Sequence, residues 1–336
     1  MKNGLNAAEA MRRLNELAAE ISGKKPDPSG EAKKQAAAYN AASWETMHTG
    51  MPQNSLKEGS DGAGGYLVPD TFEDKLVERL TEKNVLRRIS HTVRTTGKLK
   101  IPYVVKNGEA VWIIEGEDYS FDDAEFGQVE IDAYKLATSI MASDEMLEDG
   151  GIDLAKHILD MFGQRMGDAE EEAFLHGDGN GKPVGLLKQI EIGAVTETVG
   201  IVTLDDMQNL MHSVRAPYRE NATWLMSEDV YRTLRQIRHY RGNPLWEYGL
   251  AEGEPEKLFG HPIVTCKYME TVAPSSKPVL FGDFRYYWIG DRGKRVIKRL
   301  VEHYANRGQV AFIASQRVDA KLVMPDAIKA LEIKSE

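Results

Sequence analysis

The chain has 336 residues, of which 42% are hydrophobic, and this is enough for one or two packed cores. Its 52 acidic and 42 basic side chains give a formal net charge of -10, which argues against tight, sequence-independent binding to nucleic acid, because such binding needs clustered Lys and Arg. No apolar run approaches the roughly 18 residues that span a bilayer, so we expect no membrane partner.

Residues 1–60 contain two helical patterns, at 5–21 and 31–46, separated by a segment with two prolines. Neither pattern carries enough apolar side chains for a core of its own. We interpret residues 1–60 as an N-terminal arm. For residues 1–35 a disordered tail is an equal alternative.

Residues 98–137 have the pattern of a long β-hairpin. Its predicted arms, 99–114 and 126–137, alternate apolar and polar side chains with a period of two, and an acidic segment lies between them. An isolated two-stranded ribbon is marginally stable in water, so a long one needs a surface to lie on. The expected surface is another copy of the same chain, which points to an assembly subunit.

The longest helical pattern follows at 152–175, with Ile158, Phe162 and Met166 on one face and Gln164 and Glu171 on the other. Shorter helical and strand patterns between 196 and 290 indicate a second compact domain. Strands at 309–315 and 321–323 are expected to return to the sheet of the first domain. The irregular alternation of helices and strands predicts a mixed α+β fold.

No motif indicates catalysis or a cofactor. The glycine-rich loop at 177–182 resembles a phosphate-binding loop, but Lys182 is followed by Pro183 and the loop ends a helix, so we interpret it as a helix cap and turn. The histidines are not paired at metal-ligand spacing. We interpret the single cysteine, Cys266, as a small buried side chain in a protein made in a reducing compartment. We therefore predict no enzyme, no cofactor and no metal site.

Charged clusters supply the candidate site. An acidic group in the middle of the hairpin and a basic group near the C-terminus can bring subunits into register by complementary potential. We predict inter-subunit contacts for Glu115, Glu117, Asp118, Asp122, Asp123, Arg292, Arg295 and Arg299. A second basic cluster lies at 232–241, and a DNA-binding module that uses both basic clusters is an alternative.

Six short segments stand in a specific order along residues 39–335. They are DGAGGYLVP (61–69), AVWIIEG (110–116), SDEMLED (143–149), FLHGDGNGKPVGLL (174–187), FGDF (281–284) and RVDAKLVMPDA (317–327). Their order and spacing resemble the major capsid proteins of tailed bacteriophages, the family with the HK-ninety-seven-like fold.

The resemblance implies a domain plan for this chain. Residues 1–60 would be the N-terminal arm. A peripheral domain would cover 61–195, with an extended hairpin loop at 98–137 and a spine helix at 152–175. An axial domain would cover 196–290, and residues 291–336 would return to the peripheral domain. Because only about 60 residues precede the glycine joint, scaffolding is either a short remnant helix in the arm or a separate protein.

The resemblance also implies a function. The chain would be a structural subunit that self-assembles as hexamers and pentamers into the icosahedral head shell of a tailed phage or prophage. The shell would be assembled in the host bacterial cytoplasm and become the virion capsid. Its expected partners are itself, a portal, and a separate scaffold or protease, with packaged double-stranded DNA nearby.

Two other functions remain open at this point. One is an encapsulin-like compartment shell with protein cargo, and the other is a soluble enzyme with an unrecognised site. Some family members form a covalent Lys–Asn cross-link between subunits with the help of a buried Glu. No Lys lies between Lys106 and Lys135, and no Glu lies in 307–318, so we predict no such cross-link.

Overall fold

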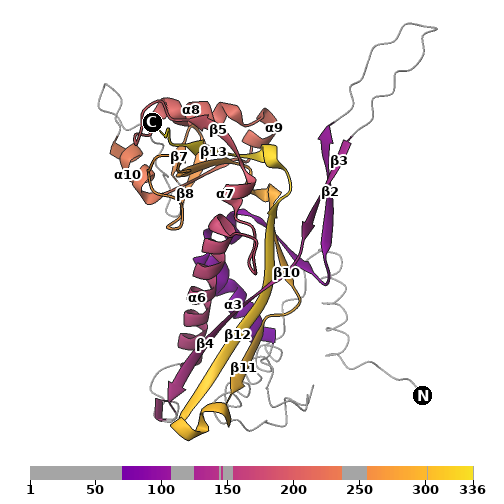
Figure 1. Ribbon diagram of the computed structural model, residues 1–336. Helices are drawn as coiled ribbons and strands as arrows, with labels where there is room; N and C mark the ends of the chain where they lie inside the picture. Colours follow the sequence, from indigo (N-terminus) through magenta and orange to yellow (C-terminus); the bar gives the residue numbers. More distant parts are fainter. Residues whose placement is uncertain are drawn as a thin grey trace, which may run out of the picture. The chain divides into compact units, whose positions relative to one another are not determined.

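The computed structural model describes residues 70–106, 125–143, 145–146, 154–236, 256–300 and 302–335. These residues belong to one compact unit, Gly65–Glu336. The predicted N-terminal arm, 1–60, and the acidic middle of the predicted hairpin, 107–124, lie outside the described residues. The unit mixes helices and strands as the sequence predicts (Figure 1).

The helices and strands of the described residues have the following bounds. The α-helices are α3 (Asp70–Lys83), α4 (Val85–Ile89), α6 (Leu154–His176), α7 (Leu186–Gln189), α8 (Leu204–Ser213), α9 (Ala216–Arg219) and α10 (Glu228–Gln236). The strands are β1 (His91–Thr95), β2 (Leu99–Lys106), β3 (Glu125–Ile131), β4 (Tyr134–Ser143), β5 (Glu191–Val195), β6 (Thr223–Met226), β7 (Lys257–Leu258), β8 (His261–Thr265), β9 (Val279–Gly282), β10 (Tyr287–Arg292), β11 (Val296–Leu300), β12 (Gln309–Leu322) and β13 (Ile328–Glu332). Three short 3-10 helices cover Phe284–Tyr286, Glu302–Arg307 and Pro325–Ala327.

A five-stranded sheet is built around the long strand β12. On one side β12 pairs with β4, and on the other it pairs with β11 and then β10, which in turn pairs with β1. The helix α6 runs along this sheet (Figure 1) and confirms the predicted spine. Its side chains Ile158, Phe162 and Met166 are at most 2% exposed, as their 3.6-residue spacing predicts.

A six-stranded sheet has the order β5-β13-β9-β6-β8-β7. In its middle, Trp224 on β6 packs against Phe281 on β9 with tilted ring planes and ring centroids 4.1 Å apart, and both side chains are fully buried. The two sheets do not divide the chain at residues 196 and 290. Strands β5 and β13 belong to the six-stranded sheet from outside that range, while β10 begins at Tyr287 and belongs to the five-stranded sheet.

The hairpin differs from its prediction in one respect. β2 and β3 form a separate antiparallel pair, as predicted, but the second arm is not one strand through residue 137. It breaks at Asp132 and Ala133, and the chain then enters the five-stranded sheet as β4. The reason is a long-range contact, because the backbone N–H of Asp132 donates to the Asp319 carboxylate at 2.8 Å instead of joining a ladder.

The predicted strands at 309–315 and 321–323 are a single strand of 14 residues, β12. The polar residues Gln316 and Asp319 lie between the two predicted strands, and both are buried and hydrogen-bonded. The loop after α6 is the predicted turn. Gly179 and Gly181 have φ values of 83° and 70°, which favour glycine.

Candidate functional site

The root of the hairpin is held by charged groups around Asp132. The Lys98 ammonium binds the Glu130 carboxylate at 2.8 Å and the Asp132 carboxylate at 3.2 Å. Arg292 on β10 binds the other oxygen of Asp132 at 3.2 Å, and Asp319 accepts from the Asp132 backbone. Five groups from four segments therefore converge where the hairpin leaves the sheet, and they set its direction.

These contacts shift the acidities of the two aspartates in opposite directions. The hydrogen bond from Lys98, supported by its charge, lowers the pKa of Asp132 below its ordinary value. Burial raises the pKa of Asp319, although two backbone N–H donors act in the opposite direction. Asp132 thus remains charged and paired, while Asp319 is a buried acceptor that holds the backbone.

Close packing fixes the same root. Ile131, the last residue of β3, is fully buried, and it lies against Gly290 on β10. A Cβ at position 290 would lie 2.6 Å from Cγ2 of Ile131, so only glycine lets the hairpin sit this close to the sheet. Further along the hairpin, Val104 and Phe126 are cross-strand partners, with exposed fractions of 37% and 68%. The ribbon therefore presents an apolar pair of which the described residues leave Phe126 largely uncovered.

The three arginines of the predicted site differ in burial and in hydrogen-bond partners. Arg292 is half-buried and its guanidinium pairs with Asp132. Arg299 is half-buried on β11. Arg295 is 8% exposed, and its guanidinium donates to the side chains of Gln316 and Asp291, both at 2.8 Å. Arg295 thus has partners inside its own chain, which sequence reasoning did not anticipate. The five predicted acidic residues, Glu115, Glu117, Asp118, Asp122 and Asp123, lie outside the described residues.

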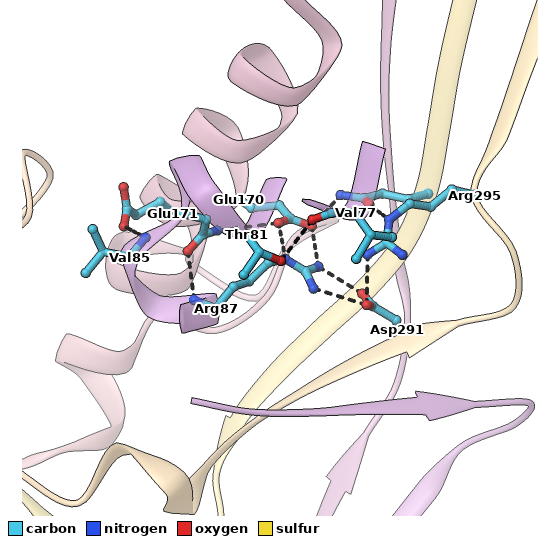
Figure 2. A network of polar contacts seen from close by, with 10 residues as sticks. Val77, Thr81, Val85, Arg87, Glu170, Glu171, Asp291 and Arg295 are labelled. Carbon is cyan, nitrogen blue, oxygen red and sulfur yellow. Dashed lines mark hydrogen bonds and ion pairs between the residues drawn. The ribbon is translucent and has the colours of Figure 1, made fainter. Parts of the chain in front are cut away.

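A buried polar network joins the helices to the five-stranded sheet (Figure 2). Arg87 on α4 makes two hydrogen bonds to Glu170 on α6, at 2.6 and 2.7 Å. It makes two more to Asp291 on β10, at 2.8 and 3.1 Å. Gln316 on β12 donates to Glu170 and accepts from Arg295, which closes the network. Two bidentate pairs on one guanidinium fix the relative positions of three elements.

The charges of this network compensate one another. Burial alone lowers the pKa of Arg87, but Glu170 and Asp291 outweigh it and keep the guanidinium charged. Burial likewise raises the pKa of Asp291, and the guanidinium groups of Arg87 and Arg295 more than reverse this, so the pKa lies below its ordinary value. No periodic pattern in the sequence indicates this network, because its partners are up to 204 residues apart.

The sequence analysis placed Glu171 on the polar face of the spine helix, and for this residue the prediction is wrong. It is 2% exposed, and its carboxylate accepts from the backbone N–H of Val85 at 2.7 Å. Burial raises the pKa of Glu171. It serves as an acceptor at the start of α4, where helix N–H groups have no intrahelical partner (Figure 2).

The described residues hold no group of three or more His, Cys, Asp and Glu side chains that could bind a metal ion. Among them no helix is both long enough and apolar enough to cross a bilayer. Cys266 is 2% exposed, and burial raises the pKa of its thiol to about 12, so it is the small buried side chain predicted.

Comparison with known proteins identifies a family. The family model described as "Phage capsid family" matches residues 64–333. The major capsid protein of Klebsiella oxytoca phage phiKO2 is 23% identical over 247 residues, which cover 69% of this chain and 57% of that protein. The major capsid protein of Escherichia phage T5 is 23% identical over 274 residues, which cover 74% of this chain and 58% of that protein. The chain thus spans less than three fifths of these curated relatives.

Solved structures show the same fold. The capsid of a native GTA particle matches with a TM-score of 0.66 and 24% identity, covering 84% of this chain and 96% of that one. A structure from Mycobacterium phage Adephagia matches with a TM-score of 0.58 and 17% identity, covering 75% of this chain and 90% of that one. The predicted HK-ninety-seven-like fold is confirmed.

Proposed function

The chain belongs to the phage capsid family, and on this premise we propose that it is a structural subunit of an icosahedral head shell. In this proposal hexamers and pentamers of the chain tile a shell around the double-stranded DNA of a tailed phage or prophage. The subunit has no catalytic role and no cofactor. It is assembled in the host bacterial cytoplasm and becomes part of the virion capsid.

The observation that carries the proposal is a ribbon with a fixed root and an uncovered apolar pair. Ion pairs and the close contact between Ile131 and Gly290 fix the direction in which β2 and β3 leave the sheet. A two-stranded ribbon of this kind gains stability only when its apolar side chains are covered. A neighbouring subunit would cover Val104 and Phe126, and the fixed root would give every copy the same approach.

We further propose that charge pairing sets the register between neighbours. The acidic residues Glu115, Glu117, Asp118, Asp122 and Asp123 of one subunit would face the basic β10–β11 region of another, where Arg292 and Arg299 are half-buried. Arg295 is left out of this contact because its side chain is buried, with its guanidinium donating to Gln316 and Asp291. Complementary potentials of this kind favour correct encounters more than they add affinity.

The domain plan is part of the same proposal. The five-stranded sheet with α6 would form the peripheral domain, the six-stranded sheet, which includes β5 and β13, would form the axial domain near the centre of each capsomer, and residues 1–60 would form an arm. A portal and a separate scaffold or protease are the proposed further partners. Many modest contacts repeated over a shell would supply its stability, since linked contacts act together.

Electron microscopy of the purified chain expressed alone tests the proposal. We expect closed particles of uniform diameter or free capsomers, and in the phage setting we expect nuclease-protected DNA inside the particles. A protein cargo in place of DNA would favour the encapsulin-like alternative. A monodisperse small oligomer at every protein concentration would contradict the proposal.

A further inference from the structure

The chain turns out of the five-stranded sheet at a point where two strands could still pair. β4 pairs with β12 as far as Tyr134 and Val318. Beyond this pair β12 continues to Leu322, and the chain on the other side continues into the hairpin of β2 and β3. Continued by two residues, the same register would set Asp132 opposite Ala320. The ladder therefore stops although backbone is present on both strands to extend it.

The N–H groups of β12 beyond this stop point to the side on which β4 lies. On the β10 side, the N–H of Val323 donates to the carbonyl of Tyr286 at 2.9 Å. Because N–H groups alternate between the two sides of a strand, those of Ala320 and Leu322 point to the opposite side. There the N–H of Leu322 donates to the side-chain oxygen of Gln189 at 3.0 Å. A side chain thus replaces the missing strand at this position.

At Ala320 a single carboxylate takes both N–H groups of the pair that does not form. Oδ2 of Asp319 accepts from the N–H of Asp132, and Oδ1 accepts from the N–H of Ala320, both at 2.8 Å. In a continued ladder these two N–H groups would donate to carbonyl groups of the opposite strand. Asp319 is 1% exposed, and hydrogen bonds to a carboxylate are stronger than those to a neutral acceptor. The carboxylate therefore holds the place of the next ladder pair.

The turned-out chain keeps its backbone hydrogen bonds at the break. The N–H of Ala133 donates to the side chain of Asp132 at 2.9 Å, so both residues of the break have carboxylate acceptors. A ladder two residues longer would also satisfy the N–H of Asp132. The two arrangements thus differ little in the number of backbone hydrogen bonds, and the carboxylate of Asp319 favours the one in which the hairpin leaves the sheet.

We propose that Asp319 is the positioning residue of the hairpin, whose carboxylate ends the ladder and holds β2 and β3 in one direction (Figure 1). The importance of this direction rests on the proposed function, because it matters where neighbouring copies meet. Without the carboxylate, the N–H groups of Asp132 and Ala320 can be satisfied only by a longer ladder or by water. Either outcome changes the course of the chain into the hairpin. Copies with hairpins in several directions do not fit one closed, symmetric shell.

The test measures the direction of the hairpin in the dilute, unassembled full chain. Spin labels are placed at Gln128→Cys on β3 and Lys298→Cys on β11, which are both exposed positions. The native Cys266 is 2% exposed and stays unlabelled in the folded chain. Double electron–electron resonance then gives the distribution of distances between the labels. We expect one narrow distribution in the parent chain, and in Asp319→Ala a distribution at least about twice as wide, because the hairpin no longer has one direction.

Two further variants separate the carboxylate from the charges around it. Asp319→Asn keeps the shape and one acceptor oxygen but puts an NH₂ group, which cannot accept, in place of the other. Its distribution should be intermediate in width. Lys98→Met removes the ion pairs to Glu130 and Asp132, but the Lys98 side chain is 58% exposed. Because exposed ion pairs contribute little, this variant should widen the distribution less than Asp319→Asn does.

A stability control and an assembly assay complete the test. Val310→Ala removes two buried methyl groups near the opposite end of β12. It should lower the urea midpoint and leave the distance distribution and the assembly unchanged. Without labels, Asp319→Ala should yield at least about tenfold fewer closed particles than the parent chain at equal protein concentration. Electron microscopy counts the particles.

The outcomes separate this inference from the proposed function. A distribution as narrow as that of the parent in Asp319→Ala, or in Asp319→Asn if Asp319→Ala does not fold, would overturn the role of Asp319. Equal widening in Val310→Ala, a larger effect of Lys98→Met, or an unchanged particle yield in Asp319→Ala would overturn it as well. If the unaltered chain forms neither capsomers nor particles, the proposed function fails. The distances in the dilute chain then still decide whether Asp319 directs the hairpin.

Discussion

Replacing Arg87 with methionine removes the centre of the buried network while keeping a side chain of similar length. The guanidinium of Arg87 makes four charge-assisted hydrogen bonds, two to Glu170 and two to Asp291, and its side chain is 3% exposed. In the variant, Glu170 keeps Gln316 as a partner and Asp291 keeps Arg295. Two buried carboxylates would then share one remaining buried cation.

The magnitude follows from burial. Removing one partner of a buried ion pair costs about 3–5 kcal/mol, because the other charge stays buried without full compensation. For an m value of about 3 kcal/mol per M, this lowers the urea midpoint by roughly 1–2 M. The matched control is Lys267→Met, which removes a cation that binds Asp168 at 2.7 Å but is 59% exposed. It should change stability by less than about 1 kcal/mol.

Urea unfolding of the dilute, unassembled chain, followed by circular dichroism, measures both variants. If Arg87→Met moves the midpoint no further than Lys267→Met does, the buried network does not stabilise the fold as its burial implies. Arg87→Lys gives an intermediate case, because it keeps the charge and loses the two bidentate pairs. We expect its midpoint to fall between those of the parent chain and Arg87→Met.

The pH dependence gives an independent check. Burial raises the pKa of Asp291, but Arg87 and Arg295 bring it below its ordinary value in the folded chain. A carboxylate with a lowered folded pKa stabilises the fold above its unfolded pKa of about 4, and this stabilisation is lost as the pH falls through the folded pKa. The difference between the parent chain and Arg87→Met should therefore narrow below about pH 4. A constant difference down to low pH would contradict the assignment.

Three further predictions concern single positions and the assembled shell. Gly290→Ala should lower the free energy of unfolding by about 1–3 kcal/mol, because its Cβ would lie 2.6 Å from Ile131. Urea midpoints of this variant, of Ile131→Ala and of the double variant measure the coupling between the two positions. Strictly additive losses would contradict the contact. The thiol of Cys266 should react with Ellman's reagent at pH 8 at least about a thousandfold more slowly in the folded than in the unfolded chain, since burial raises its pKa to about 12; equal rates would argue against its burial. Purified shells on a denaturing gel should show only the 37.5 kDa chain, because we predict no covalent cross-link. Ladders of covalently linked chains would contradict this prediction.

Much of the local structure could be predicted from the sequence, because local signals carry it. The shorter patterns expected between 196 and 290 include the strand Thr223–Met226 and the helix α8, whose start Thr203 caps. The spine helix follows from apolar side chains spaced 3.6 residues apart, and the turn after it from glycines with positive φ. The order of short segments along the chain was also enough to indicate the family and the fold.

The candidate site was only partly predictable. The charge clusters were visible in the sequence, but nothing local showed that Arg295 would have partners inside the chain or that Glu171 would be buried on the spine helix. Arg87 was missed altogether, since an arginine followed by a second one, Arg88, has the pattern of an exposed residue. A charged side chain is buried only where the fold places an oppositely charged partner next to it. The partners of Arg87, Glu170 and Asp291, are distant from it in sequence.

By itself the sequence determined the long helix α6, the antiparallel pairing of β2 with β3, the turn after α6 and the family. Only the tertiary structure decided that the second hairpin arm breaks at Asp132, that β12 is continuous through Gln316 and Asp319, and that β5 and β13 complete the six-stranded sheet. Periodicity reports how a residue relates to its immediate neighbours along the chain. Each of these three outcomes depends on a hydrogen bond or strand pairing between residues more than 100 positions apart, which no local pattern encodes.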